Sequence, residues 1–359
     1  SAEDSITLVV TDTTAPSSPS IIINNGDGST SNTVVSLTLS ASDDVGVAAY
    51  YAAETNSTPA STSASWNSVT SSTNYSATVS FTLASSGSAG TFSRTVYIWF
   101  KDAAGNVSDS ASDSITIYPV AISVSAGGYH TCAIDNESAT TCWGRGDYGQ
   151  LGNGSTSDQS TPVSVNDISK ATAVSAGYYH TCAVLTVGTV KCWGNGSSGQ
   201  LGNGMTSDQS TPVSVSGINT AIAISAGYDH TCALLSDGSI KCWGYGDSGQ
   251  LGNGSISIIQ STPVTVSDNN TAIAISAGFS RTCAVLSGGG VKCWGYGAHG
   301  WLGNGSTTNQ NTPDSVLGIS TATDVSVGGF SGEYGHTCVV LSGGTLKCWG
   351  FGADGRLGD

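Results

Sequence analysis

The ten cysteines are the side chains whose type and spacing point most clearly to chemistry, and they fall into five pairs. In each pair nine residues separate the two cysteines, and Trp-Gly follows the second one. The pairs are Cys132 and Cys142, Cys182 and Cys192, Cys232 and Cys242, Cys283 and Cys293, and Cys338 and Cys348. Cysteines at a fixed spacing can form disulfides, bind zinc or stay buried as reduced thiols.

Histidines beside these cysteines make zinc an alternative. In four repeats a histidine stands two residues before the first cysteine, which would place both side chains on one face of a strand. These histidines are His130, His180, His230 and His336. However, Arg281 takes this place in the fourth repeat, no further ligand recurs, and structural zinc sites favour two to four residues between paired cysteines. Disulfides are therefore favoured over free thiols and zinc, and the histidine is interpreted as structural.

The segment between the third pair of cysteines indicates the element that positions them. A three-residue hairpin loop needs a left-handed residue, usually Gly, at its third position. With residues 236–238 as this loop, Gly238 takes that position and Cys232 faces Cys242 on a close, non-hydrogen-bonded pair. The same register fits the other pairs, although the first has Ser138 in place of Gly. Five such bridges indicate an oxidising compartment outside the cytoplasm.

Aromatic residues at positions that differ between the repeats are candidates for binding. Such residues on loops of a rigid scaffold suit a protein or glycan interface, with a tolerant rim as the alternative. After Trp-Gly these are Tyr148, Tyr245 and Tyr296, and others precede the recurring histidine at Tyr129, Tyr178, Tyr179, Tyr228 and Phe279. A longer segment in the fifth repeat adds Phe330, Glu333 and Tyr334.

Composition excludes several functional classes. The 25 acidic and 10 basic residues give a net charge of -15, which argues against nucleic acid or an anionic membrane as partner. No apolar run approaches the roughly 18 residues that span a bilayer. Only 10% of residues are charged and 48 are Gly, which disfavours helices and predicts an all-β protein. Ser1 does not begin a signal peptide and residues 355–359 stop inside a repeated motif, so we expect a longer protein at both ends.

The distribution of cysteines divides the chain into two blocks. We interpret residues 1–12 as the last strand of a preceding domain, because residues 113–117 repeat the pattern of residues 4–8. Residues 13–119 alternate apolar with polar residues and are predicted to form a β-sandwich. In residues 120–359 the first cysteines are spaced by 50, 50, 51 and 55 residues, which indicates blades of a β-propeller.

Residues 120–359 also carry a family pattern. It reads Ala-Gly-x-x-His-Thr-Cys-Ala-x-Leu, then Cys-Trp-Gly-x-Gly-x-x-Gly-Gln-Leu-Gly-Asn-Gly, then Thr-Pro-Val. This pattern resembles the regulator-of-chromosome-condensation repeat, which implies a β-propeller of usually seven blades, so the five repeats here would form an incomplete ring. The family's founder is a chromatin-bound exchange factor for the Ran GTPase. The acidity and the cysteine pairs instead favour the secreted bacterial relatives, which act as protein-binding surfaces.

The first block resembles a bacterial immunoglobulin-like adhesin module. The matching segments are Asp12-Thr-Thr-Ala-Pro16, Ala41-Ser-Asp-Asp-Val-Gly46 and Lys101-Asp-Ala-Ala-Gly-Asn-Val-Ser108. In such modules these segments meet near the end of the domain, which makes Asp12, Asp43, Asp44 and Asp102 candidate ligands for calcium between domains. Calcium takes six to eight oxygen ligands on flexible loops. Simple turn formation is the equal alternative.

Together these patterns predict an extracellular or cell-surface binding or adhesion protein. The propeller would be the head and the immunoglobulin-like domain the stalk, with a protein or glycan on another cell or surface as partner. No nucleophile-base pair, phosphate loop or carboxylate pair stands out, so no catalytic activity is expected, and calcium is the one cofactor considered. The alternative is a structural subunit of an extracellular filament or surface layer, which would self-associate through residues 1–12.

Overall fold

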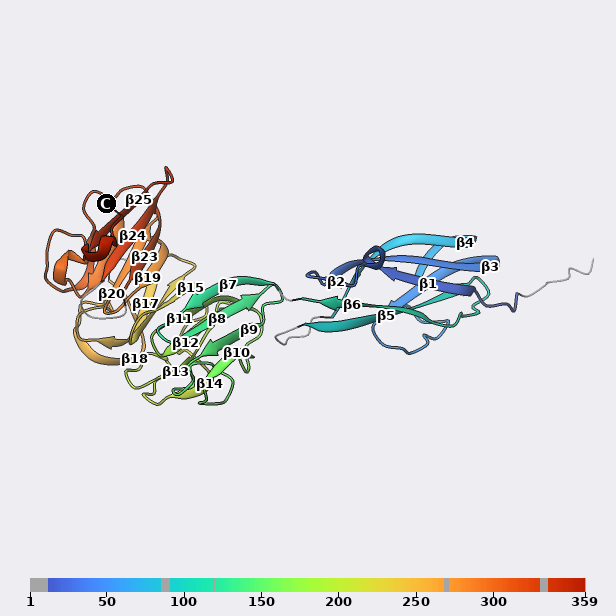
Figure 1. Cartoon of the computed structure of the whole chain (residues 1–359), viewed down its shortest axis with the longest axis horizontal. Helices are drawn as coiled ribbons and strands as arrows, with labels where there is room; N and C mark the ends of the chain where they lie inside the picture. Colours follow the sequence, from blue (N-terminus) through green and yellow to red (C-terminus); the bar gives the residue numbers. More distant parts are fainter. Residues whose placement is uncertain (1–11, 85–90, 119, 268–270, 330–334, 359) are drawn as a thin grey trace, which may run out of the picture. The chain divides into compact units, whose positions relative to one another are not determined.

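The computed structural model describes residues 12–84, 91–118, 120–267, 271–329 and 335–358 (Figure 1). The chain divides at Val120 and Ala121 into two compact units, an N-terminal unit and a repeat region. Besides strands, the described residues form three short 3-10 helices, η1 (Asn24–Gly26), η2 (Ala298–Gly300) and η3 (Ala353–Gly355). The all-β prediction is confirmed. In this part of the chain no helix has the length and apolar character to cross a bilayer.

The described residues of the N-terminal unit form six strands, hydrogen-bonded in the order β1-β3-β5-β6-β2 with β4 also on β3. They are β1 (Ser17–Ile23), β2 (Ser29–Thr30), β3 (Val34–Ala53), β4 (Asn67–Thr82), β5 (Phe92–Asp102) and β6 (Ala111–Ile117). The long β3 pairs with β1 along its first half, with β5 along its second half, and with β4 along both. Its register shifts between Ser42 and Val47, where it leaves β1 and joins β5.

Alternation along β3 builds the core of this unit. Val35, Leu37, Leu39 and Ala41 are buried, because every second side chain of a strand points to the same face. Side chains of β5 and β6 complete the core, among them Ile98, Phe100, Ile115 and Ile117. The next inward position of β3 belongs to Asp43.

The repeat region consists of five consecutive antiparallel sheets, one for each sequence repeat, which we call blades 1 to 5 (Figure 1). Blade 1 contains β7 (Ala121–Ala126), β8 (His130–Asp135), β9 (Thr140–Gly144) and β10 (Gln159–Ser164), and blade 2 contains β11 (Ala171–Ala176), β12 (His180–Leu185), β13 (Val190–Gly194) and β14 (Gln209–Ser214). Blade 3 contains β15 (Ala221–Ala226), β16 (His230–Leu235), β17 (Ile240–Gly246) and β18 (Ser257–Thr265). Blade 4 contains β19 (Ala272–Ala277), β20 (Arg281–Leu286), β21 (Val291–Gly295) and β22 (Gln310–Ser315), and the described part of blade 5 contains β23 (Ala322–Gly328), β24 (His336–Leu341) and β25 (Leu346–Gly350).

A disulfide joins the second and third strands of every blade. Cys232 lies opposite Cys242 with their Cα atoms 4.1 Å apart, and the other four blades repeat this pairing. In the loop between them Gly238 has a φ of +81°, and Ser138 adopts a φ of +65° at the equivalent place in blade 1. The predicted hairpin register and the pairing within repeats are confirmed, and none of the ten cysteines is free.

Neighbouring blades are joined by bonds that recur with the sequence. The Trp that follows the second cysteine reaches back to the preceding blade, as where Trp243 Nε1 donates to the carbonyl of Gln200 at 2.8 Å. A Ser on each first strand reaches forward, as where Ser175 Oγ accepts from the amide of Ala226 at 2.9 Å. Equivalent bonds occur at the other junctions. The Trp-Gly dipeptide and the recurring Ser therefore stabilise the contacts between blades.

Gly202 tests how tightly these junctions are packed, and Gly217 is a matched control. Both glycines have a left-handed φ, of +68° and +66°. A Cβ added to Gly202 would lie 2.7 Å from Trp243 Nε1, whereas Gly217 faces open space. We expect Gly217→Ala to lower the free energy of unfolding by about 1 kcal/mol, and Gly202→Ala by about 1–3 kcal/mol more because Trp243 must move. Urea unfolding measures both losses, and equal losses would show that the contact with Trp243 does not matter.

Candidate functional site

Two sets of loops gather at the same end of each blade. The second strand begins where the third strand ends, so the loop before the recurring histidine lies beside the loop after Trp-Gly. In blade 1 the amide of Arg145 donates to the carbonyl of Tyr129 at 2.9 Å, and the same bond recurs in blades 2, 3 and 4. The positions that vary most between the repeats therefore share one face.

Six aromatic side chains on this face form a continuous series of ring contacts across blades 1 to 4, which we call the aromatic ladder. Its members are Tyr129, Tyr148, Tyr178, Tyr179, Tyr228 and Phe279. The rings of Tyr178 and Tyr228 stack with centroids 4.1 Å apart, and Phe279 continues the series 4.9 Å from Tyr228. All six rings stay at least partly exposed, so the ladder offers apolar area together with hydroxyl groups.

The hydroxyl groups of the ladder are partly used within it. The hydroxyl oxygens of Tyr129 and Tyr178 are 3.1 Å apart, and this hydrogen bond is the main reason that the pKa of Tyr178 is raised. Burial and then the neighbouring Asp229 raise the pKa of Tyr228. Tyr178 and Tyr228, at the centre of the ladder, are therefore uncharged at physiological pH.

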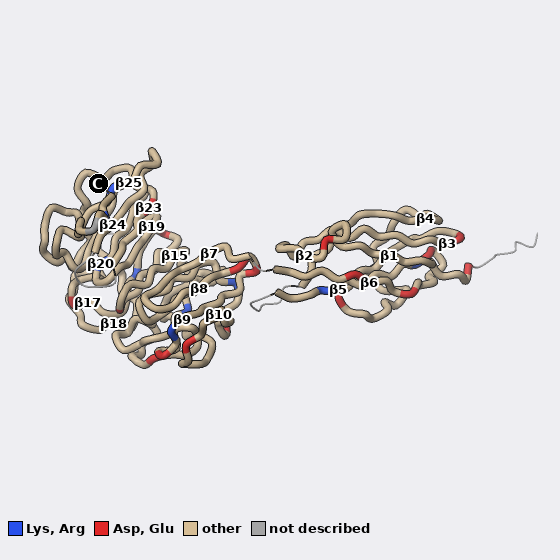
Figure 2. The backbone as a smooth tube through the Cα atoms, viewed as in Figure 1, with Lys and Arg blue, Asp and Glu red and all other residues tan. Residues whose placement is uncertain are grey.

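Opposite charges flank the ladder. The guanidinium of Arg145 lies over the rings of Tyr129 and Tyr179 at 5.3 and 5.4 Å from their centroids, and it also pairs with Asp147. Burial raises the pKa of Asp229 to about 6, and Gln200 Nε2 donates to its Oδ1 at 3.4 Å. Lys and Arg are few elsewhere in the repeat region (Figure 2). A ligand on this face would meet the guanidinium of Arg145, the exposed carboxylate of Asp147 that pairs with it, and the carboxyl group of Asp229, which titrates near pH 6.

Three of the four recurring histidines, His130, His180 and His230, lie between neighbouring blades. His180 Nε2 is 2.8 Å from Thr231 Oγ1, and that hydroxyl donates its own proton to the carbonyl of Gln200 at 3.0 Å, so His180 must be the donor. His130 and His230 make the same bonds, and the Nδ1 atoms of all three rings are buried with no hydrogen-bond partner in the described part of the chain. Burial lowers the pKa of His130 to about 4, of His180 to about 3 and of His230 to about 4. These rings are neutral and held in place, which supports their interpretation as structural.

In blade 4 an arginine replaces this histidine. Arg281 is fully buried, lies 4.7 Å from the ring centroid of Trp301, and donates through Nη2 to the carbonyls of Gly328 and His336. Burial lowers the pKa of Arg281 to about 9. The longer side chain thus reaches the next blade directly, without the hydroxyl relay of the other junctions.

Two models of one repeat family match the repeat region. Residues 142–184, 188–234 and 237–285 match one model of the regulator of chromosome condensation (RCC1) repeat, and residues 121–150, 171–200, 221–250 and 272–300 match a second. Residues 121–300 are RCC1 repeats. The resemblance carried by the Cys-Trp-Gly pattern is thereby confirmed for this part of the chain.

Solved structures share the fold of the RCC1 repeats. The chain is similar to Prp20p from Saccharomyces cerevisiae, with 21% identity and a TM-score of 0.57 over 78% of this chain and 71% of that one. Its similarity to human WBSCR16 is 23% identity with a TM-score of 0.59, over 67% of this chain and 64% of that one. At these identities the structures show the fold alone.

Curated relatives match over a shorter stretch. The chain is 35% identical over 89 residues to the human E3 ubiquitin-protein ligase HERC2, and 32% identical over 88 residues to the E3 ubiquitin-protein ligase MYCBP2 of Danio rerio. Each match covers 24% of this chain and only 2% of the relative. The shared part is thus a small piece of those proteins.

The RCC1 repeats place the predicted binding residues in different surroundings. Tyr148 belongs to the aromatic ladder, 4.8 Å from Tyr179 between ring centroids. The hydroxyl of Tyr245 donates to Asp247 at 2.9 Å, and Tyr296 packs against the edge of Trp301 in a second cluster. The other predicted residues, Phe330, Glu333 and Tyr334, lie outside the described residues. Most of the ladder comes from the other candidates, the residues just before the recurring histidine. Their signal in the sequence was an aromatic residue two places before this histidine, or before Arg281, in repeats 2 to 4, and one place before it in repeats 1 and 2.

The N-terminal unit gathers three of the four predicted calcium ligands. Asp12, Asp43 and Asp44 each bring a ligand atom within 4.8 Å of the others. Asp102 is instead bonded to its own loop, where its Oδ1 accepts from the amides of Gly105 and Asn106.

Proposed function

We propose that this protein is an extracellular or cell-surface binding protein that uses the aromatic ladder of its RCC1 repeats to hold a protein partner. The observation that carries the proposal is the ladder itself, six adjoining rings beside Arg145 on a scaffold of disulfide-bonded blades. Tyrosine and arginine are enriched among the residues that dominate binding energy at protein interfaces. Stacked tyrosines also suit sugar rings, so a glycan is the second candidate ligand.

The relatives support binding over catalysis. A solved structure holds yeast RCC1 (Prp20) bound to Kap60, and another reports binding of Prp20p to Gsp1p and histones. Those partners belong to those proteins. For this chain the net charge of -15 favours a neutral or basic partner and disfavours nucleic acid.

The location and the stalk are part of the same proposal. Five disulfides persist only where the environment is oxidising, which supports a place outside the cytoplasm. We propose an immunoglobulin-like sandwich for the N-terminal unit, supported by the inward alternation of β3 and by the core that its side chains share with those of β5 and β6. The filament alternative depends on residues 1–12, of which Asp12 alone is described.

Removing two rings of the ladder tests the proposal. We expect the double variant Tyr178→Ser and Tyr228→Ser to fold normally and to lose at least about tenfold in affinity, because truncated hot-spot aromatics typically weaken binding by 2 kcal/mol or more. Val187→Ser is the matched control, since Val187 is 72% exposed in the hairpin loop at the opposite end of blade 2.

The measurement compares the parent and both variants on one panel of cell-surface proteins and one glycan array, with far-ultraviolet circular dichroism as the check on folding. Protein ligands lost by the double variant and kept by Val187→Ser would support the proposal. Ligands that both variants retain, or that both lose, would place the contact elsewhere. A hit confined to the glycan array would favour the second candidate.

A further inference from the structure

The inward positions of β3 end on an acidic residue. Asp43 continues the alternation that begins at Val35 and is 7% exposed, so its carboxylate lies where the strand pattern places core side chains. Its Oδ1 accepts hydrogen bonds from the amides of Val45 at 3.1 Å and Gly46 at 2.6 Å. Its Oδ2 is buried and finds no hydrogen-bond partner among the described residues. A buried carboxylate oxygen in this state is strongly unfavourable unless a positive charge reaches it.

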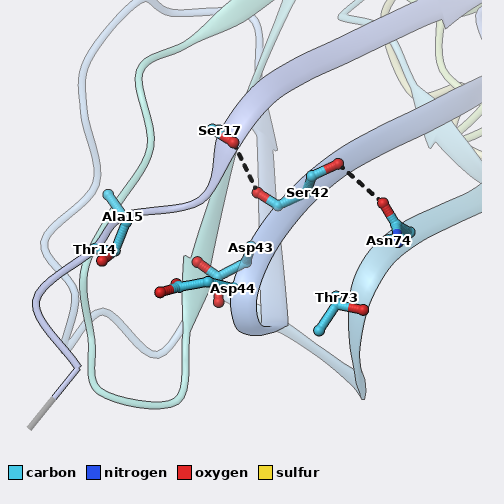
Figure 3. Close-up of a pocket in the computed structure, with 8 residues that line it drawn as sticks. All are labelled: Thr14, Ala15, Ser17, Ser42, Asp43, Asp44, Thr73 and Asn74. Carbon is cyan, nitrogen blue, oxygen red and sulfur yellow. Dashed lines mark hydrogen bonds between the residues drawn. The ribbon is translucent and has the colours of Figure 1, made fainter.

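Two further carboxylates surround this oxygen. Asp44 follows on the same strand and Asp12 comes from the segment before β1, and the ligand atoms of the three lie within 4.8 Å of one another. Figure 3 shows the side chains of Asp43 and Asp44 turned toward the segment of Thr14 and Ala15. Three like charges at this separation repel one another unless a cation lies between them.

Within the described residues of the N-terminal unit, no basic side chain serves as a cation for this cluster. Residues 1–120 contain only two basic side chains, Arg94 and Lys101. Arg94 pairs with Glu54 at 3.3 Å, while Lys101 donates to the carbonyl of Ser61 at 2.8 Å and lies over the ring of Trp66. Both basic groups of the N-terminal unit are thus engaged away from the three aspartates.

Asp102 holds the segment that carries Asp12. Its Oδ2 accepts from Asn106 Nδ2 at 2.6 Å, which orients that amide. The same Nδ2 lies 3.2 Å from the carbonyl of Asp12 and 3.4 Å from the carbonyl of Thr14. The loop after β5 thereby fixes the backbone on which the Asp12 carboxylate stands.

We propose that Asp12, Asp43 and Asp44 bind one Ca²⁺ ion, with Asp43 Oδ2 as the buried ligand and Asp102 as a positioning residue. Carboxylate oxygens are the ligands of hard cations, whereas zinc prefers histidine and cysteine. Ca²⁺ also accepts the irregular arrangement that a strand end and a loop provide, whereas Mg²⁺ demands a near-ideal octahedron. The site is independent of the aromatic ladder, so either proposal can fail without the other.

Calorimetric titration of the intact, EDTA-stripped chain with CaCl₂ tests the site. We expect saturation at one ion per chain, and a rise of about 10 °C in the melting temperature of the N-terminal unit at a hundredfold excess over Kd. Asp12→Asn and Asp44→Asn should each weaken binding at least tenfold, and Asp43→Asn should abolish it. Without calcium Asp43→Asn should melt no lower than the parent, because the substitution removes the repulsion; this separates loss of a ligand from loss of folding.

Asp27→Asn is the matched control, because Asp27 is an exposed aspartate of the same unit outside the cluster. It should bind calcium as the parent does. The proposal is overturned if the parent does not saturate by about 10 mM Ca²⁺, above the range of extracellular calcium modules. Equal affinity for MgCl₂, or an equal loss in Asp27→Asn and Asp44→Asn, would also overturn it.

Discussion

A reducing agent is expected to unfold the repeat region while the N-terminal unit stays folded. Each disulfide closes a loop between cysteines ten positions apart, which is worth about 2–3 kcal/mol in the chain-entropy model. Five such losses together approach or exceed the whole stability of an ordinary domain, about 5–15 kcal/mol. Residues 1–120 contain no cysteine, so the N-terminal unit is an internal control.

Stepwise reduction followed by alkylation and mass spectrometry would follow this loss. Cys338 and Cys348 of blade 5 are half-buried, whereas the other eight cysteines are fully buried. We therefore expect the Cys338–Cys348 bond to open first and the remaining four to open together as the blades unfold. If the repeat region kept its melting temperature after complete reduction, the bridges would have no part in its stability.

Acid is expected to destabilise the repeat region between about pH 6.5 and pH 4. Burial lowers the pKa of His130 to about 4, of His180 to about 3 and of His230 to about 4, so these rings stay neutral while the unfolded chain takes up protons near pH 6.5. The unfolded state then binds more protons, and stability falls as the pH falls toward the folded-state pKa values. For His130 the difference corresponds to about 3 kcal/mol.

Asp229 acts in the opposite direction. Burial raises the pKa of Asp229 to about 6, so its contribution is present below the ordinary value near 4 and is lost as the pH rises through 6. Near pH 5 the unfolded chain holds about three protons on the three histidines, whereas the folded chain holds about one proton on Asp229. Unfolding therefore takes up about two protons in this range.

Urea titrations at a series of pH values give the slope of the free energy of unfolding against pH, which reports this proton uptake. His180→Gln keeps a donor near the place of Nε2 and cannot titrate, so its slope should be smaller by about one proton. Val187→Ser, at an exposed position in a hairpin loop, should leave the slope unchanged. An unchanged slope in His180→Gln would show that the buried histidines do not determine the acid sensitivity.

Much of the fold could be predicted because its determinants are local. The left-handed residue at the third position of a three-residue loop fixes which residues face each other, so the position of Gly238 predicts that Cys232 meets Cys242. The spacing of about 50 residues between the first cysteines then predicts one antiparallel sheet for each repeat. The inward alternation of β3 is equally visible in the sequence.

The candidate sites were harder to predict because they depend on contacts between distant segments. Tyr148 and Tyr245 occupy nearby places in their repeats, yet Tyr148 meets the additional Tyr179 of the next blade while Tyr245 bonds to its own Asp247. Asp102 lies in the loop that was predicted to carry a calcium ligand, but both of its carboxylate oxygens accept hydrogen bonds from Asn106. A shared motif indicates that such residues lie close together. It does not distinguish a residue that binds a ligand from one that only positions the binding residue.

The recurring junction bonds have a consequence for how this protein can change over generations. Every junction has the same Ser-to-amide and Trp-to-carbonyl bonds, and the three junctions among blades 1 to 4 also share the histidine bond. A blade copied within this part of the chain therefore meets compatible partners. Unequal recombination between the coding segments of adjacent repeats would insert or delete a whole blade without any new interface having to evolve. Each such event among blades 1 to 4 would also lengthen or shorten the aromatic ladder, so the size of this surface would follow the number of blades.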